Sequence, residues 1–181
     1  MFKYFHLTKM QRQSILKWSL YGLLTLLTLL LQTVVLSRTT GLRIKLTPYP
    51  ILVVCVCVRE GPEKGGAYAI LAALFWCFSG ADFGNLSVAV LPVGAMLSAV
   101  LCRAVLTLRF LPTALCAFAV TLLNATAIFI FKLILPPTVE LANYWRILLP
   151  TAALSMVFFP LQYPLVNSIN RIWERDELKR T

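Results

Sequence analysis

The stretch REGPEKGGAYAILAALFWCFSGADFG, residues Arg59–Gly84, decides how the rest of the chain is interpreted. It begins with a charged turn, Arg59-Glu60-Gly61-Pro62, and continues through an apolar segment to a second glycine-containing turn. Gly61 can adopt backbone angles that are closed to other residues, and Pro62 suits the first turn of a helix because it needs no amide partner there. The stretch therefore predicts one apolar helix held between two turns.

Small residues recur every four positions in this helix, at Gly65, Ala69, Ala73 and Cys77. That spacing places them on one helix face, where small side chains let another helix approach closely in lipid. Chance in an alanine-rich segment is the alternative, and we favour a face that packs on another helix or a partner. The next apolar segment carries the same spacing at Gly94, Ser98 and Cys102.

The composition is that of a membrane protein. Apolar residues make up 59% of the 181 residues, charged residues only 13%, and the mean hydropathy is +0.80. A soluble domain usually has about 45–50% apolar and about 25% charged residues. Because apolar runs close to bilayer-spanning length recur along the chain, we predict an all-α polytopic membrane protein.

We expect about six transmembrane helices, in a single domain over residues 18–169. The second is short: at about 1.5 Å per residue its apolar run, residues 48–58, rises only about 16 Å against a hydrocarbon core of about 30 Å. It must be tilted or partly broken, or begin earlier through Leu42 and Ile44. Pro160 and Pro164 fall inside the sixth helix and should break or bend it. The six expected segments are residues 18–36, 48–58, 62–79, 86–102, 113–135 and 147–169.

The distribution of basic residues predicts that both termini are cytoplasmic. Most of the 17 Lys and Arg residues fall in residues 1–17, in residues 170–181 and in the connections expected on that same side. Residues 1–17 suit a basic amphipathic helix on the membrane surface or a partly disordered flank, and residues 170–181 form a charged tail. The net charge of +10 is not gathered in one patch, so it favours contact with anionic lipid over nucleic acid.

No constellation of residues predicts catalysis, a metal site or a cofactor. The chain has one His and seven acidic residues, none paired within a span. The five cysteines are an odd number, and Cys55 and Cys57 have no histidine or acid beside them, so neither a disulfide framework nor a metal site is expected. The spans contain four strongly polar residues, Gln32, Asn124, Gln162 and Asn167. They either bind a solute or hydrogen-bond one another or a kinked backbone, and we favour the second role.

The opening stretch resembles the MreD family of bacterial rod-shape-determining membrane proteins over about residues 48–100. The shared features are the short second span ending in Arg59-Glu60-Gly61-Pro62 and a third span with Ala73-Leu74-Phe75-Trp76. A Ser79-Gly80 turn and Phe83-Gly84-Asn85 then lead to a leucine- and valine-rich fourth span. The chain departs from the family in two ways. The family has an aspartate where this chain has Cys77, and family-type glycines correspond to Ala69 and Ala73. These departures imply a divergent member with altered partner contacts on this helix face.

The resemblance implies a non-enzymatic scaffold of the cell-elongation machinery in the bacterial cytoplasmic membrane. Its implied partners are an MreC-type bitopic protein, actin-like MreB filaments, and a shape-type glycosyltransferase with its penicillin-binding transpeptidase. The alternative is a substrate-capture subunit of an energy-coupling-factor vitamin transporter, which is also a six-helix protein. The alanine-rich docking motif of those subunits could be mimicked here by Ala69, Ala72 and Ala73.

Overall fold

The part of the chain that the structure describes consists of helices and short connections, with no strand. The computed structural model describes residues 9–36, 46–79, 84–105, 109–134 and 141–178, with the side chains of 9–11, 35–36, 84–87, 131–134, 141–147 and 172–178 left out. Its elements are α1 (Lys9–Leu30), the π-helical turn η1 (Leu31–Leu36), α2 (Tyr49–Glu60), α3 (Pro62–Phe78), α4 (Gly84–Ala104), α5 (Phe110–Ile134), α6 (Leu141–Ser155), the 3₁₀ turn η3 (Met156–Phe158) and α7 (Phe159–Leu178). The predicted all-α class is confirmed.

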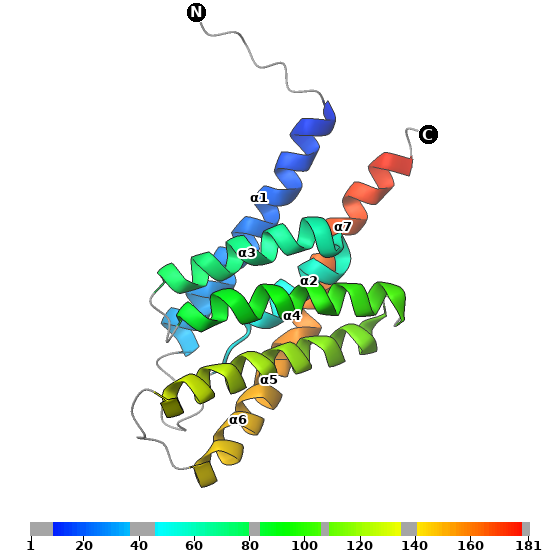
Figure 1. Cartoon of the computed structure of the whole chain (residues 1–181). Helices are drawn as coiled ribbons and strands as arrows, with labels where there is room; N and C mark the ends of the chain where they lie inside the picture. The colour runs from blue at the N-terminus through cyan, green and yellow to red at the C-terminus, as the bar shows by residue number, and fades with distance from the viewer. Residues whose placement is uncertain (1–8, 37–45, 80–83, 106–108, 135–140, 179–181) are drawn as a thin grey trace, which may run out of the picture.

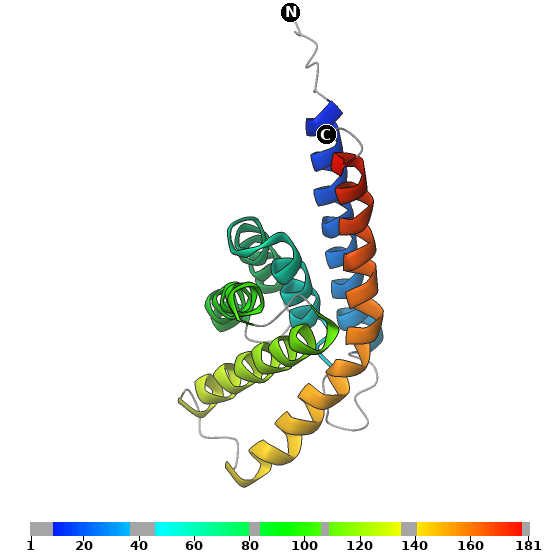
Figure 2. The same ribbon diagram turned by 90° about the vertical axis from the view of Figure 1, so that its right-hand side faces the viewer.

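Two groups of helices enclose α2. In Figure 1, α3, α4 and α5 lie one beside the next, while α1 and α7 run side by side across them. Figure 2 shows α2 between these two groups, where it packs against α1, α3, α4, α5 and α7. The first turn of α1 and the last turn of α7 lie at the same end of the molecule, which we call the terminal end.

Helix α2 is the centre of the core. Every side chain from Tyr49 to Val58 is buried, and most have no exposed surface at all. A helix that is apolar on all faces has no side to turn towards water, so it is stable where other helices surround it. The alternative of a broken helix is wrong, because α2 is continuous from Tyr49 to Glu60. Residues 46–48 before it are not helical, and Leu42 and Ile44, through which an earlier start was expected, lie outside the described residues.

The C-terminal pair of helices is one long, bent segment. Pro160 has no amide hydrogen to offer the carbonyl one turn earlier, at Met156, and the chain tightens into η3 at that point. Figure 2 shows α6 leaving the direction of α7 there. The bend expected at Pro160 is therefore present, whereas α7 continues through Pro164 and across the expected boundary at residue 170.

Helices long and apolar enough to cross a membrane are present in three places among the described residues. They are Arg12–Val34, Phe110–Ile130 and Leu148–Arg171, with the shorter apolar helix Val88–Ala104 beside them. Large apolar side chains are exposed along α1, α3, α4, α5 and α7. Such a surface is stable against lipid and unstable in water, which agrees with a membrane protein.

Candidate functional site

The charged turn between α2 and α3 is tightly closed. Gly61 ends α2 with φ at 96°, a left-handed conformation that favours glycine, and its amide donates to the Cys57 carbonyl at 2.9 Å. The next helix starts at once with Pro62, and the Gly65 amide donates to the Gly61 carbonyl at 2.8 Å. A Cβ atom on Gly61 would lie 2.8 Å from the Arg103 guanidinium, so glycine leaves the space that Arg103 fills.

Glu60 and Lys17 together join three helices at this turn. Its Oε1 atom lies 2.6 Å from the Lys17 ammonium nitrogen and accepts a hydrogen bond from the Tyr21 hydroxyl at 2.8 Å, and both partners come from α1. Lys17 also donates to Oδ1 of Asn170 on α7 at 2.9 Å. The Glu60 side chain is only 7% exposed, so its carboxylate is stabilised by these partners more than by solvent.

Arg59 and Arg103 extend the same arrangement to α7 and α4. The Arg59 guanidinium donates to the Tyr163 hydroxyl at 2.9 Å and lies 5.4 Å from the centre of that ring. Arg103, near the end of α4, donates to the Arg59 carbonyl at 2.8 Å. We call this set the turn junction; its members are Lys17, Tyr21, Arg59, Glu60, Gly61, Arg103, Tyr163 and Asn170.

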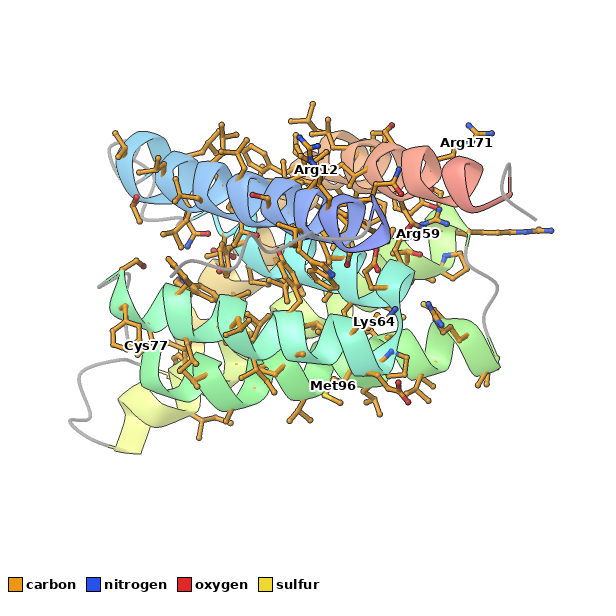
Figure 3. The ribbon with its side chains drawn as sticks, turned by 90° about the horizontal axis from the view of Figure 1, so that it is seen from above. Arg12, Arg59, Lys64, Cys77, Met96 and Arg171 are labelled. Atoms are coloured by element: carbon orange, nitrogen blue, oxygen red, sulfur yellow. The ribbon has the colours of Figure 1, made fainter. Side chains whose placement is uncertain are left out.

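The turn junction holds α1, α2, α4 and α7 together at the terminal end. Figure 3 shows Arg59, Lys64 and Arg171 towards this end and Cys77 at the other. An aromatic cluster adds to the α1 side, because Tyr21 packs against Trp18 and Tyr68 with ring centres 5.8 and 6.2 Å away. The hydroxyl of Tyr68 also bonds Thr25, which ties α3 to α1.

The small-residue stripe of α3 lies mainly inside the chain. Gly65, Ala69 and Ala73 are buried, and a Cβ atom on Gly65 would lie 2.6 Å from the Cα atom of Cys57 in α2. The backbones of α2 and α3 therefore meet at this glycine. Cys77 is half-buried and ends the stripe, while Trp76 beside it is buried.

The stripe of α4 also faces neighbouring helices. Gly94 and Ser98 are buried, and a Cβ atom on Gly94 would lie 3.1 Å from a methyl group of Val120 in α5. The Ser98 hydroxyl donates to the Gly94 carbonyl at 2.8 Å, so this polar group is satisfied within α4. Whether either stripe also contacts a partner remains a prediction.

The second predicted turn is described only in part. The Ser79 hydroxyl donates to the Trp76 carbonyl at 2.7 Å at the end of α3. Gly80 and Phe83 lie outside the described residues. Gly84 and Asn85 are the first residues of α4, and the Asn85 side chain is outside the described part.

A second polar group surrounds the first turn of α2, at the end opposite the turn junction. The Tyr49 amide donates to Oε1 of Gln32 at 3.3 Å, and its hydroxyl donates to the Ala72 carbonyl at 2.7 Å. The Gln162 side chain donates to the Pro48 carbonyl at 3.3 Å. Oε1 of Gln162 and Nε1 of Trp76, whose ring packs 5.1 Å from that of Tyr49, are buried without a hydrogen-bond partner.

Sequence reasoning missed most of the turn junction. It singled out Arg59, Glu60 and Gly61, but not Lys17, Tyr21, Arg103, Tyr163 or Asn170 as their partners. One signal was present: Lys17 and Tyr21 are four residues apart at the start of a span, so both lie on one helix face. Nothing in the sequence alone paired Tyr163 and Asn170 with residues on α1 and α2.

No protein-family model, curated protein or solved structure matches the chain. In the described part of the chain, no three His, Cys, Asp or Glu side chains gather to hold a metal ion. The fold and the site therefore define a helical membrane protein with a charged junction at one end, and the function is argued from these features.

Proposed function

We propose that this protein is a non-enzymatic membrane scaffold of the bacterial cell-elongation machinery, of the MreD type. In this proposal the chain crosses the cytoplasmic membrane six times, with α6 and α7 forming one bent span and both termini in the cytoplasm. It binds an MreC-type bitopic protein and helps to link actin-like filaments to the cell-wall synthase.

The observation that supports the proposal most directly is the position of the Arg59-Glu60-Gly61-Pro62 motif in the fold. The motif that carries the resemblance is also the point at which α1, α2, α4 and α7 are bonded together. A turn that positions four helices fixes the outer faces of all four. A scaffold needs such fixed faces, because partner helices in lipid recognise each other by close packing of preformed surfaces.

The arrangement of charges supports the proposed orientation. Arg59, Lys64 and Arg171 lie towards the terminal end, whereas the exposed surfaces of the helices between the two ends are largely apolar. Basic residues on one side of a membrane protein favour the cytoplasmic side. With that end inside, α1 and the combined α6–α7 segment cross fully, and the buried α2 crosses within the bundle.

The test is the shape of a rod-shaped bacterium that depends on this gene. Depletion of the chain should turn rods into round cells, and a plasmid copy should restore them. Gly65→Leu, which forces α3 away from α2, should fail to restore rods, whereas Gly22→Leu, on an exposed part of α1 with nothing within 4 Å, should succeed. Rods that persist through full depletion would rule the proposal out.

The polar group at the first turn of α2 favours a second candidate, the substrate-capture subunit of a vitamin transporter. Buried Trp76 and Gln162 each retain an unpartnered polar atom, and such atoms in a membrane protein call for an explanation. A thermal-shift screen of the purified chain against water-soluble vitamins separates the two candidates. Saturable stabilisation that Gln162→Leu abolishes would favour the transporter subunit over the scaffold.

A further inference from the structure

Two cysteine thiols from neighbouring helices face each other near the terminal end. The sulfur atoms of Cys102 in α4 and Cys116 in α5 are 3.6 Å apart, and both residues are free thiols. Cys102 is 1% exposed and Cys116 is 8% exposed. Among the described cysteines, this pair has its two sulfur atoms in direct contact.

The helices that carry these thiols pack directly against each other. Gly94 of α4 lies against the Val120 side chain of α5, and Ala95, Ala99 and Ala117 on these two helices are fully buried. The connection between the two helices is short, so their antiparallel register near Cys102 is fixed by the chain itself. A disulfide has its sulfur atoms about 2.0 Å apart, so these two sulfur atoms must approach each other by about 1.6 Å to form one.

We propose that Cys102 and Cys116 form a redox-modifiable site, which a small hydroperoxide converts to an intramolecular disulfide. Cys116, the more exposed thiol, loses its proton and attacks the O–O bond, giving a sulfenic acid and one molecule of water. The Cys102 sulfur then attacks the sulfenic sulfur, and the sulfenic oxygen leaves as the second water. In total, two thiols and one hydrogen peroxide give one disulfide and two waters, with the thiols oxidised and the peroxide reduced.

The other cysteines are placed unfavourably for this reaction. Cys55 and Cys57 are two positions apart on α2, and that spacing turns their side chains about 200° apart around the helix. Cys77 lies at the opposite end of the molecule (Figure 3). Oxidation within the chain should therefore select the Cys102–Cys116 pair.

The disulfide would act on the turn junction through the residue next to it. Arg103 follows Cys102 directly, and its guanidinium donates to the Arg59 carbonyl and lies against Gly61. Joining α4 to α5 at Cys102 restricts the end of α4 from which Arg103 reaches the turn. The oxidised protein should therefore hold the turn junction more rigidly than the reduced protein.

The experiment oxidises the full chain in lipid nanodiscs with hydrogen peroxide, blocks free thiols with N-ethylmaleimide, and identifies linked peptides by mass spectrometry. The expected product joins Cys102 to Cys116, loses two hydrogens, and reverts with dithiothreitol. Cys102→Ser and Cys116→Ser should each abolish it. The matched variants Cys55→Ser, Cys57→Ser and Cys77→Ser should retain it.

A second measurement uses dibromobimane, which bridges two nearby thiols without an oxidant. Bridging at Cys102 and Cys116 without any disulfide after peroxide treatment would overturn the proposal while leaving the geometry intact. Absence of both products in a protein that keeps its cooperative thermal unfolding would overturn the proposal and its geometry together. A disulfide formed mainly between Cys77 residues of two chains would also contradict it.

Discussion

The ammonium nitrogen of Lys17 lies 2.6 Å from Oε1 of Glu60, and this ion pair joins the first helix to the end of the buried second helix. Tyr21 and Asn170 complete the contact with hydrogen bonds to the carboxylate and the ammonium group. A paired charge that is withdrawn from solvent stabilises a structure only while both partners remain, because the cost of burying each charge is offset by the other.

Removing Glu60 should be more damaging than removing both charges. Glu60→Ala leaves Lys17 without its counter-ion, and we expect a loss of about 3–5 kcal/mol in the free energy of unfolding. The double variant Lys17→Met/Glu60→Leu should lose less stability than Glu60→Ala alone, as equilibrium unfolding in mixed micelles can show. Glu63→Ala, an exposed acid of the same turn, is the control and should change stability by less than about 0.5 kcal/mol.

Gly65 and Gly66 are neighbours that should respond differently to the same change. A Cβ atom on Gly65 meets the Cys57 backbone at 2.6 Å, whereas one on Gly66 meets the flexible Met96 side chain at 3.0 Å. Gly65→Ala should therefore lower the unfolding free energy by about 1–3 kcal/mol, and Gly66→Ala by much less. Equal losses for the two variants, measured in the same micelles, would mean that α3 does not meet the α2 backbone at Gly65.

Gly61 should be sensitive to substitution for two separable reasons. A side chain at φ 96° is strained by about 1–2 kcal/mol, and its Cβ atom would also displace the Arg103 guanidinium. Gly61→Ala should therefore destabilise the wild-type chain more than it destabilises an Arg103→Ala chain, in which only the backbone strain remains. If the double-mutant cycle gives no coupling energy, Arg103 does not occupy the space above Gly61.

Substitutions at Gln162 and Tyr49 should lower the free energy of unfolding by different amounts, although both side chains are buried at the first turn of α2. Gln162→Leu removes one long hydrogen bond together with an unpartnered carbonyl, so the free energy of unfolding should stay within about 1 kcal/mol of wild type. Tyr49→Phe removes the well-formed bond to the Ala72 carbonyl and should lower it by about 0.5–1.5 kcal/mol. A loss above about 2 kcal/mol for Gln162→Leu would indicate that its oxygen has a partner.

The sequence predicted where the helices lie along the chain. It predicted less well which helix is enclosed by the others and which face lipid. Hydropathy and turn residues located the helices, and Pro160 located the bend before α7, because these depend on local chemistry. Pro164 did not bend the helix. The environment of the short helix at residues 48–58 was harder to predict, since length alone cannot separate a lipid-facing helix from one enclosed by neighbours. Its lack of any polar face was the usable signal for burial.

The partners of the charged turn could not be predicted for a different reason. Lys17 and Asn170 are 153 positions apart, and Arg59 and Tyr163 are 104 apart. Which residues meet across such separations depends on how α1 and α7 cross α2, and neither periodicity nor composition specifies that crossing. The motif Arg59–Pro62 could be recognised as a turn, but its four-helix role required the fold.

The most direct test of the central claim is co-purification from membranes of the rod-shaped host. The tagged chain should retain an MreC-type bitopic protein in stoichiometric amounts. Gly65→Leu should lose that protein, and Gly22→Leu should keep it, because only the first separates α3 from α2. Wild-type chain that folds, inserts and still retains no such protein would contradict the claim that this fold is a scaffold of cell elongation.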